Sequence, residues 1–228
     1  MVTGALLSAG PSVGTAQPVG PAKRVLFIGN SFTSINGGLD KQLERLAPSV
    51  VATSVTYGGF TLENHWTDGH AVQAIGRDGW TDVVLQDQSV APVLSATEFD
   101  QYGRAFDGEV RRVGAETVLL MTWERPDVVN AGVTSSALAA AYDRLGGALA
   151  AKVAPAGTAF AASLRERPDL VLNLQDGHPT AFGTYLAGCV VYGTVFGRTP
   201  VGNVASDPTL PPDLQAYFQA VAAGVLGY

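Results

Sequence analysis

Short apolar runs separated by longer helical segments form the dominant pattern of this chain from residue 24 onward. Four of the runs predict strands, because each is brief, rich in aliphatic or β-branched residues, and followed by a glycine or a polar residue. These runs are residues 25–28, 50–57, 83–85 and 117–121. A fifth strand is expected either at residues 151–154 or nearer Leu170. The first run is continuously apolar, which is typical of a strand covered on both faces of a parallel sheet.

The segments between these runs have helical spacing or composition. Residues 39–46 place Leu39, Leu43 and Leu46 on one helical face. Further helices are expected at residues 96–113, 135–151, 180–196 and 213–226. The segment 180–196 is apolar nearly all round and predicts a helix packed deep against the sheet. The alternation of strands and helices predicts an α/β fold, a doubly wound parallel sheet with helices on both faces.

Composition narrows the range of folds and partners. The chain has 228 residues, of which 46% are hydrophobic and 15% charged, so one domain with a sizeable core is expected over residues 24–228. The net charge is -6 and Lys and Arg do not cluster, which argues against a nucleic-acid partner. No uninterrupted apolar stretch reaches the length of about 18 residues that a membrane span needs.

Residues 1–23 differ in composition from the rest and are expected to be a flexible leader. Gly, Ser, Pro and Ala dominate this segment, and its apolar stretch is short. One interpretation is the end of a secretory signal with Gly14-Thr15-Ala16 as a cleavage site, which would place the protein outside the cytoplasm. The alternative is a disordered leader or an expression remnant, in which case the expected compartment is the cytoplasm.

Polar residues that follow the predicted strands are candidates for chemistry, because ligands of such sheets bind at the carboxyl ends of the strands. Ser31 follows the first strand in the turn 29–33, where it is either a nucleophile or a helix cap. Gly59 follows the second strand, and its N–H could point into a site or belong to an ordinary turn. Gln86 follows the third strand as an oxyanion donor or a loop residue. Trp123 follows the fourth and lines a pocket or covers the edge of the core.

A carboxylate and an imidazole lie two residues apart in Asp176-Gly177-His178. On an extended backbone, residues i and i+2 face the same way, so the two side chains are expected to meet. Of the three histidines, His178 combines an adjacent acid with Pro179 after it, at the start of the apolar segment 180–196, which makes it the candidate base for Ser31.

Metal binding is not expected. Cys189 is the only cysteine and lies in an apolar run, where a buried structural thiol is expected. His65 and His70 are five residues apart without a supporting metal motif. His70 is expected to face solvent. His65 either contacts substrate or braces the loop that follows Gly59.

At these residues the chain resembles the SGNH (GDSL-like) hydrolase superfamily. Residues 29–33 are similar to its first block, Gly59 to the glycine of the second, Gln86 to the Asn of the third, and Asp176 and His178 to the last block. The likeness runs from about residue 24 to residue 202, and the stretch 178–200 is similar to a bacterial branch related to carbohydrate and sialate O-acetylesterases. The chain departs from the family pattern in two places. The usual spacing is Asp-x-x-His, but here one residue separates Asp176 from His178, and Gln175 takes the usual Asp position. In the third block, Gln86 replaces the usual Asn.

The resemblance implies a flavodoxin-like, three-layer sheet and ester hydrolysis without a metal or organic cofactor. Ser31 is then the nucleophile, His178 its base and Asp176 the acid that orients the base. The Ser31 and Gly59 N–H groups, with Gln86, form the oxyanion hole, and Asn30, Trp123 and His65 contact substrate. The expected substrate is an acetyl ester of a carbohydrate. Alternatives are acyl transfer, lipid or thioester hydrolysis on the same site, and a non-catalytic glycan-binding relative.

A preference for short acyl chains is also expected. The loops after the strands offer aromatic side chains as pocket walls but no long apolar insertion that could cover a fatty chain. The candidate walls are Tyr57, Phe60, Trp66 and Trp123.

Overall fold

A computed structural model describes residues 22–77, 79–203 and 207–228. In this part of the chain a single sheet of five parallel strands has the order β2-β1-β3-β4-β5, which is the flavodoxin-like arrangement. The strands are β1 (Arg24–Gly29), β2 (Val51–Thr56), β3 (Asp82–Leu85), β4 (Glu116–Leu120) and β5 (Lys152–Ala154). The α/β doubly wound fold and the four strands expected from the apolar runs are confirmed. The fifth strand lies at the first of the two expected places.

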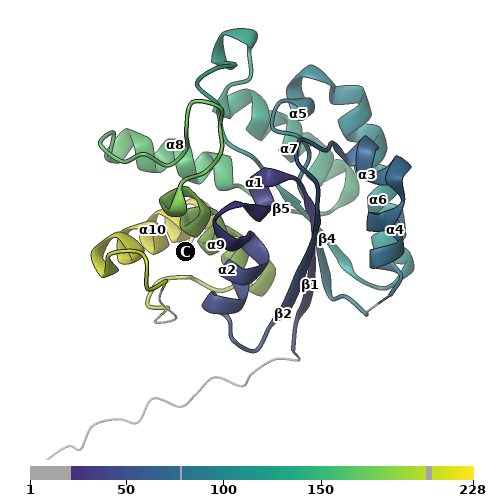
Figure 1. Cartoon of the computed structure of the whole chain (residues 1–228), viewed down its shortest axis with the longest axis horizontal. Helices are drawn as coiled ribbons and strands as arrows, with labels where there is room; N and C mark the ends of the chain where they lie inside the picture. Colours follow the sequence, from purple (N-terminus) through teal and green to yellow (C-terminus); the bar gives the residue numbers. More distant parts are fainter. Residues whose placement is uncertain (1–21, 78, 204–206) are drawn as a thin grey trace, which may run out of the picture.

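Helices cover both faces of the sheet, as Figure 1 shows. One face carries α2 (Leu39–Leu46), α8 (Ala156–Glu166), α9 (Ala181–Phe196) and α10 (Pro212–Leu226). The other face carries α3 (Leu62–Asp68), α4 (His70–Ile75), α6 (Ala96–Arg112) and α7 (Ser135–Leu149). The short helices α1 (Ser31–Ser34) and α5 (Ala91–Leu94) and the 3-10 turns η1 (Ile35–Gly37) and η2 (Val129–Ala131) belong to the connections.

Strand β1 shows how one apolar run serves two cores. Val25 and Phe27 belong to the cluster under α2, α8, α9 and α10, whereas Leu26 and Ile28 belong to the cluster on the opposite face. All four side chains are fully buried. Successive strand residues point to opposite faces, so a strand covered on both sides needs an apolar residue at every position.

Five helices of the structure have no counterpart among the expected ones, namely α1, α3, α4, α5 and α8. Four of them have seven residues or fewer, which is too short to repeat an apolar stripe over two turns. Helix α8 has eleven residues, but its small Ala and Gly residues give little contrast between faces.

Helix α9 is buried on nearly all sides, as its apolar composition predicts. Cys189 lies on it with no exposed surface, and burial raises the pKa of its thiol to about 12. This agrees with a structural thiol.

In the described residues no helix is long and apolar enough to cross a membrane.

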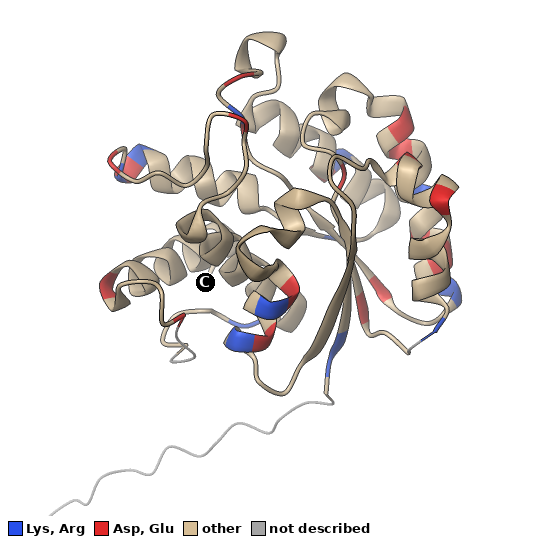
Figure 2. Cartoon of the chain, in the orientation of Figure 1, with Lys and Arg blue, Asp and Glu red and all other residues tan. Residues whose placement is uncertain are grey.

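Figure 2 shows acidic and basic positions together on α2 and on α6, whereas the buried α9 carries neither. Most of the proposed leader, residues 1–21, lies outside the described residues. Lys23, which directly precedes β1, forms an ion pair with the buried Asp82 at 2.8 Å.

Candidate active site

Ser31 is the first residue of α1 and lies directly beyond the carboxyl end of the interior strand β1. Asn30 precedes it as the helix cap, because the Asn30 side chain accepts a hydrogen bond from the Phe32 N–H at 3.0 Å. Gly29 is required at the end of the strand, since a Cβ there would collide with the side chains of Gln86 and Thr33. The strand and the cap together fix the position of the Ser31 hydroxyl.

Ser31 meets His178 across 147 residues of sequence. The Ser31 Oγ lies 2.9 Å from His178 Nε2, and His178 Nδ1 lies 2.9 Å from Asp176 Oδ2. The side chain of His178 is 32% exposed and that of Asp176 61%, so the pair is open to solvent at the mouth of the sheet. A hydroxyl, an imidazole and a carboxylate in this order form the arrangement that activates a serine nucleophile.

A tight turn brings Asp176 and His178 together, and the expected extended backbone is wrong. Gly177 has a φ of +85°, in the left-handed region that favours glycine. The Asp176 carboxylate also accepts the His178 backbone N–H at 3.1 Å, and this bond, together with the imidazole, lowers the pKa of Asp176. The two-residue spacing therefore suffices for contact. Gln175 is exposed and forms no hydrogen bond in the described part of the chain.

A stack of three buried aromatic rings supports the turn at Gly177 from inside the protein. Trp123 is 2% exposed and lies parallel between Phe32, at a centroid distance of 5.2 Å, and Phe160, at 4.2 Å. Its Nε1 donates a hydrogen bond to the Gly177 carbonyl at 2.8 Å. The expected substrate contact of Trp123 is not seen at Ser31, because both ring faces are covered and the polar edge is used inside the protein.

A cavity of about 210 Å³ opens beside the Ser31 hydroxyl. Its wall residues come from the loops after four of the strands and from the turn before α9: Asn30, Ser31, Phe32, Gly59, Gln88, Ser89, Arg125, Asp176 and His178. Gly59 has a φ of +73°. Among the described residues neither the Gly59 N–H nor the Ser31 N–H has a hydrogen-bond acceptor, so both remain available to a ligand.

The contacts of Gln86 do not support the role of oxyanion donor. Its side chain is 1% exposed and does not line the cavity. The Gln86 Oε1 accepts hydrogen bonds from the Asn30 N–H at 3.0 Å and from the Thr33 hydroxyl at 2.8 Å, and its Nε2 donates to the Asp87 carbonyl. Gln86 thus fastens the Ser31 turn to β3 from inside the protein.

His65 and Asn30 likewise hold the loops together. His65 has no exposed surface, and its Nε2 lies 2.7 Å from the Gly29 carbonyl oxygen, so it braces the loop and the expected substrate contact is wrong. The Asn30 Nδ2 donates to the Phe60 carbonyl at 3.0 Å while its oxygen caps α1. The Asn30 side chain is therefore occupied within the protein, although the residue borders the cavity.

The four aromatic residues expected as pocket walls do not line the Ser31 cavity. Trp66 packs edge-on against Phe106 in the core, and Tyr57 and Phe60 pack against each other and His65. Short-range sequence order placed them after strands but could not show which way their rings turn.

Arg125 is the main site residue that the sequence patterns did not reveal. Its guanidinium donates to the Ser89 hydroxyl at 3.0 Å and pairs with Asp127 at 2.6 Å. Its aliphatic stem lies against Gly177, where a Cβ would collide with it. The only available signal was its place two residues after Trp123, in the loop that follows β4.

In the described part of the chain no group of three or more His, Cys, Asp or Glu side chains could hold a metal ion.

Comparison with known proteins places this geometry in a structural context. No model of a known protein family matches the sequence, and no curated protein matches it either. Among solved structures, a candidate SGNH hydrolase from Slackia heliotrinireducens is similar with a TM-score of 0.68 and 25% identity, over 76% of this chain and 99% of that one. A DUF4886 family protein from Bacteroides uniformis has a TM-score of 0.69 and 18% identity, over 91% and 95% of the two chains.

An acetyl xylan esterase is also similar, with a TM-score of 0.63 and 16% identity over 76% of this chain and 100% of that one. These likenesses agree with the motif resemblance at residues 29–33, Gly59 and His178. The chain therefore has the fold of the SGNH hydrolases, the superfamily that its sequence motifs predict.

Proposed function

We propose that this protein is a serine ester hydrolase that removes small acyl groups, in the first place acetyl groups, from a carbohydrate. The observation that carries the proposal is the continuous hydrogen-bonded chain from Ser31 through His178 to Asp176, with 2.9 Å at each step. It lies at the carboxyl end of the interior strand β1, where α/β folds bind their ligands.

The reaction follows from the positions of these atoms. As the Ser31 Oγ attacks the ester carbonyl carbon, His178 Nε2 takes the hydroxyl proton and Asp176 stabilises the imidazolium at Nδ1. The tetrahedral intermediate then collapses: the bond to the alcohol oxygen breaks, and His178 returns the proton to that oxygen. Water attacks the acyl-serine in the same way, which releases the acid and restores the Ser31 hydroxyl.

The negative charge of each intermediate needs donors, and two backbone groups supply them. The N–H groups of Ser31 and Gly59 border the cavity and have no acceptor among the described residues. Removal of one such donor costs about 3 kcal/mol of transition-state stabilisation in a well-studied protease. Because these donors belong to the backbone, their alignment depends on the Asn30 cap and on the left-handed turn at Gly59.

Two observations support the acetyl-sugar assignment. The cavity of about 210 Å³ suits a small acyl group, and its polar wall residues Gln88, Ser89 and Arg125 suit a hydroxylated alcohol. The similar structures also include an acetyl xylan esterase and an acetyl-xylooligosaccharide esterase.

The direct test is hydrolysis of p-nitrophenyl acetate by the wild-type protein and by Ser31→Ala. The variant should lose activity to near background and keep its melting temperature, and a serine-directed phosphonate should label Ser31 alone. Ser34→Ala is the matched control, because Ser34 is exposed on the same short helix. Absence of wild-type activity, or labelling at Ser89, would contradict the proposal.

A further inference from the structure

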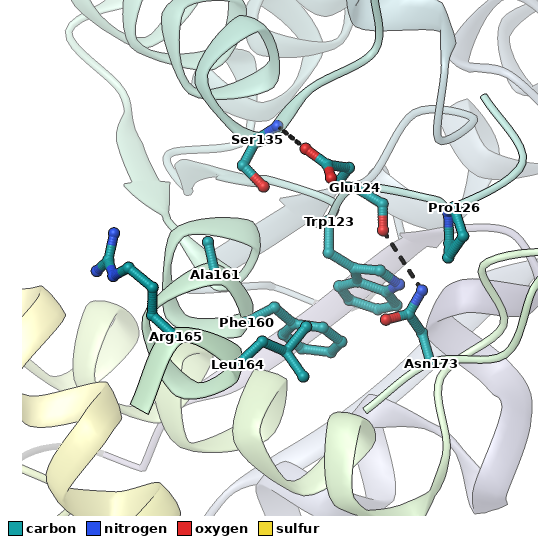
Figure 3. Close-up of a pocket in the computed structure, with 9 residues that line it drawn as sticks. All are labelled: Trp123, Glu124, Pro126, Ser135, Phe160, Ala161, Leu164, Arg165 and Asn173. Atoms are coloured by element: carbon teal, nitrogen blue, oxygen red, sulfur yellow. Dashed lines mark hydrogen bonds between the residues drawn. The ribbon is translucent and has the colours of Figure 1, made fainter. Parts of the chain in front are cut away.

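A second cavity, of about 430 Å³, lies on the other side of the loops that carry Arg125 and His178. Figure 3 shows its lining, which comes from the loop after β4, the start of α7, helix α8 and the segment before His178. The lining residues are Trp123, Glu124, Pro126, Ser135, Phe160, Ala161, Leu164, Arg165 and Asn173. The proposed reaction makes no use of this space.

The two cavities share one dividing wall. Glu124 and Pro126 border the second cavity, whereas Arg125 between them borders the Ser31 cavity. Asn173 likewise faces the second cavity, three residues before Asp176 on the other side. The Asn173 amide donates to the Glu124 carbonyl at 3.4 Å and ties the two segments of the wall together. The two cavities therefore lie on opposite sides of the same loop segment.

Three polar side chains bring uncommitted oxygens to the second cavity. One Glu124 carboxylate oxygen accepts the Ser135 N–H at 2.8 Å, which leaves the other without a partner among the described residues. The Ser135 hydroxyl and the Asn173 side-chain oxygen also have no partner there. Figure 3 shows these groups around Leu164 and the largely buried rings of Trp123 and Phe160. Arg165 adds an exposed guanidinium at the rim.

We infer that this cavity is a subsite for a neutral sugar residue that neighbours the acylated one. Sugar hydroxyls donate to carboxylate and amide oxygens and accept from Ser135 and Arg165, while the C–H face of the ring packs on Leu164 and Ala161. A fatty acyl chain fits poorly, because it would desolvate the Glu124 carboxylate without compensation. The inference extends the proposed function from a single acyl group to an oligosaccharide ester.

The test compares Ala161→Phe, which fills the cavity from α8, with Ala162→Phe on the adjacent position of the same helix. Ala162 faces a different groove, together with Tyr217 and Val221, so it is a matched control. The measured quantity is the ratio of kcat/KM for acetylated xylotriose to kcat/KM for p-nitrophenyl acetate. Ala161→Phe should lower this ratio about tenfold, the value of one or two lost hydrogen bonds, and Ala162→Phe should preserve it.

Binding is measured separately, by calorimetric titration of Ser31→Ala with xylotriose, cellotriose and maltotriose. At least one trisaccharide should bind, and adding Ala161→Phe should weaken it about tenfold. Glu124→Gln should also weaken binding, because a charge-assisted bond becomes neutral while an oxygen remains for the Ser135 N–H.

The two proposals fail in different ways. Sugar binding that depends on Ala161, without ester hydrolysis by the wild type, would overturn the enzyme assignment and retain the subsite. Hydrolysis of p-nitrophenyl acetate with no trisaccharide binding, or with a ratio that Ala161→Phe leaves unchanged, would overturn the subsite alone.

Discussion

The Trp123 indole N–H donates a hydrogen bond to the Gly177 carbonyl at 2.8 Å, so a core side chain holds the peptide between Asp176 and His178. The ring of Trp123 is itself fixed by parallel stacking on Phe32 and Phe160. Phe32 also meets the His178 ring edge-on at 5.3 Å. The position of the imidazole thus depends on packing beneath the site as well as on its acid partner.

Trp123→Phe tests this support, because phenylalanine retains an aromatic ring in the stack but has no N–H. The kcat for p-nitrophenyl acetate should fall about tenfold, the effect of roughly 1.4 kcal/mol, with KM within about twofold. Trp80→Phe is the matched control, since the buried Trp80 also donates its N–H to a carbonyl, that of Ala74, outside the site. Equal kcat values for the two variants would show that the Gly177 contact has no part in positioning His178.

Asp176→Asn tests the acid. A neutral amide does not stabilise the imidazolium, so kcat should fall at least about 10²-fold, and up to about 10⁴-fold if Asp176 acts as in the serine proteases. Asp169→Asn serves as the control, because Asp169 is an exposed carboxylate that pairs with Arg167 and does not line the Ser31 cavity. Near-full activity of Asp176→Asn, in steady-state assays at neutral pH, would mean that another group orients His178.

Gln86→Met separates an oxyanion donor from a structural residue. It leaves the Asn30 N–H and the Thr33 hydroxyl without their acceptor, so the free energy of unfolding should fall by about 1–3 kcal/mol in urea titrations. A donor to the oxyanion would behave differently. If Gln86→Met kept the stability of the wild type but lost 10²- to 10³-fold in kcat, Gln86 would be an oxyanion donor after all.

Asp87→Asn should change how stability depends on pH. Burial raises the pKa of Asp87 to about 6, although the Leu62 and Gln88 N–H groups bind its carboxylate. In the unfolded chain the pKa is about 3.9, so between these values the folded state binds more protons and stability falls as pH rises. Asp87→Asn has no group that titrates at this position, so its stability should not fall in this way as pH rises.

The check is the difference in unfolding free energy between Asp87→Asn and the wild type at pH 4 and pH 7. Between pH 4 and pH 7 this difference should shift in favour of the variant by up to about 3 kcal/mol, because the pKa of Asp87 is raised by about two units and one unit corresponds to about 1.4 kcal/mol. A shift in favour of the wild type would show that the carboxylate is stabilised, not destabilised, by its surroundings.

The size of the Ser31 cavity predicts the acyl preference. A space of about 210 Å³ with Gln88, Ser89 and Arg125 in its wall offers little apolar surface to an eight-carbon chain. We expect kcat/KM for p-nitrophenyl acetate to exceed that for the octanoate by at least about tenfold, or roughly 1.4 kcal/mol. Faster cleavage of the octanoate would indicate a lipase-like enzyme.

Sequence patterns sufficed for the parts of this protein that depend on local periodicity. Apolar runs located β1 to β4, because a strand covered on both faces must be apolar at successive positions. The turn beyond the first strand singled out Ser31, because parallel strands bring their carboxyl ends to one edge. An adjacent acid in a turn before an apolar helix singled out His178. The Asp176 spacing also pointed to the partner that the structure shows, although Gly177 turns the backbone where an extended segment was expected.

Only the tertiary structure decided which polar and aromatic side chains face the cavity. Gln86, His65 and Trp123 all follow strands, yet each turns inward to bond a backbone or side-chain group from another segment. Arg125 reaches the Ser31 cavity, and Glu124 beside it reaches the second. The direction of a loop side chain depends on hydrogen-bond partners and space supplied by distant parts of the chain, and the spacing of residues along one segment carries no record of them.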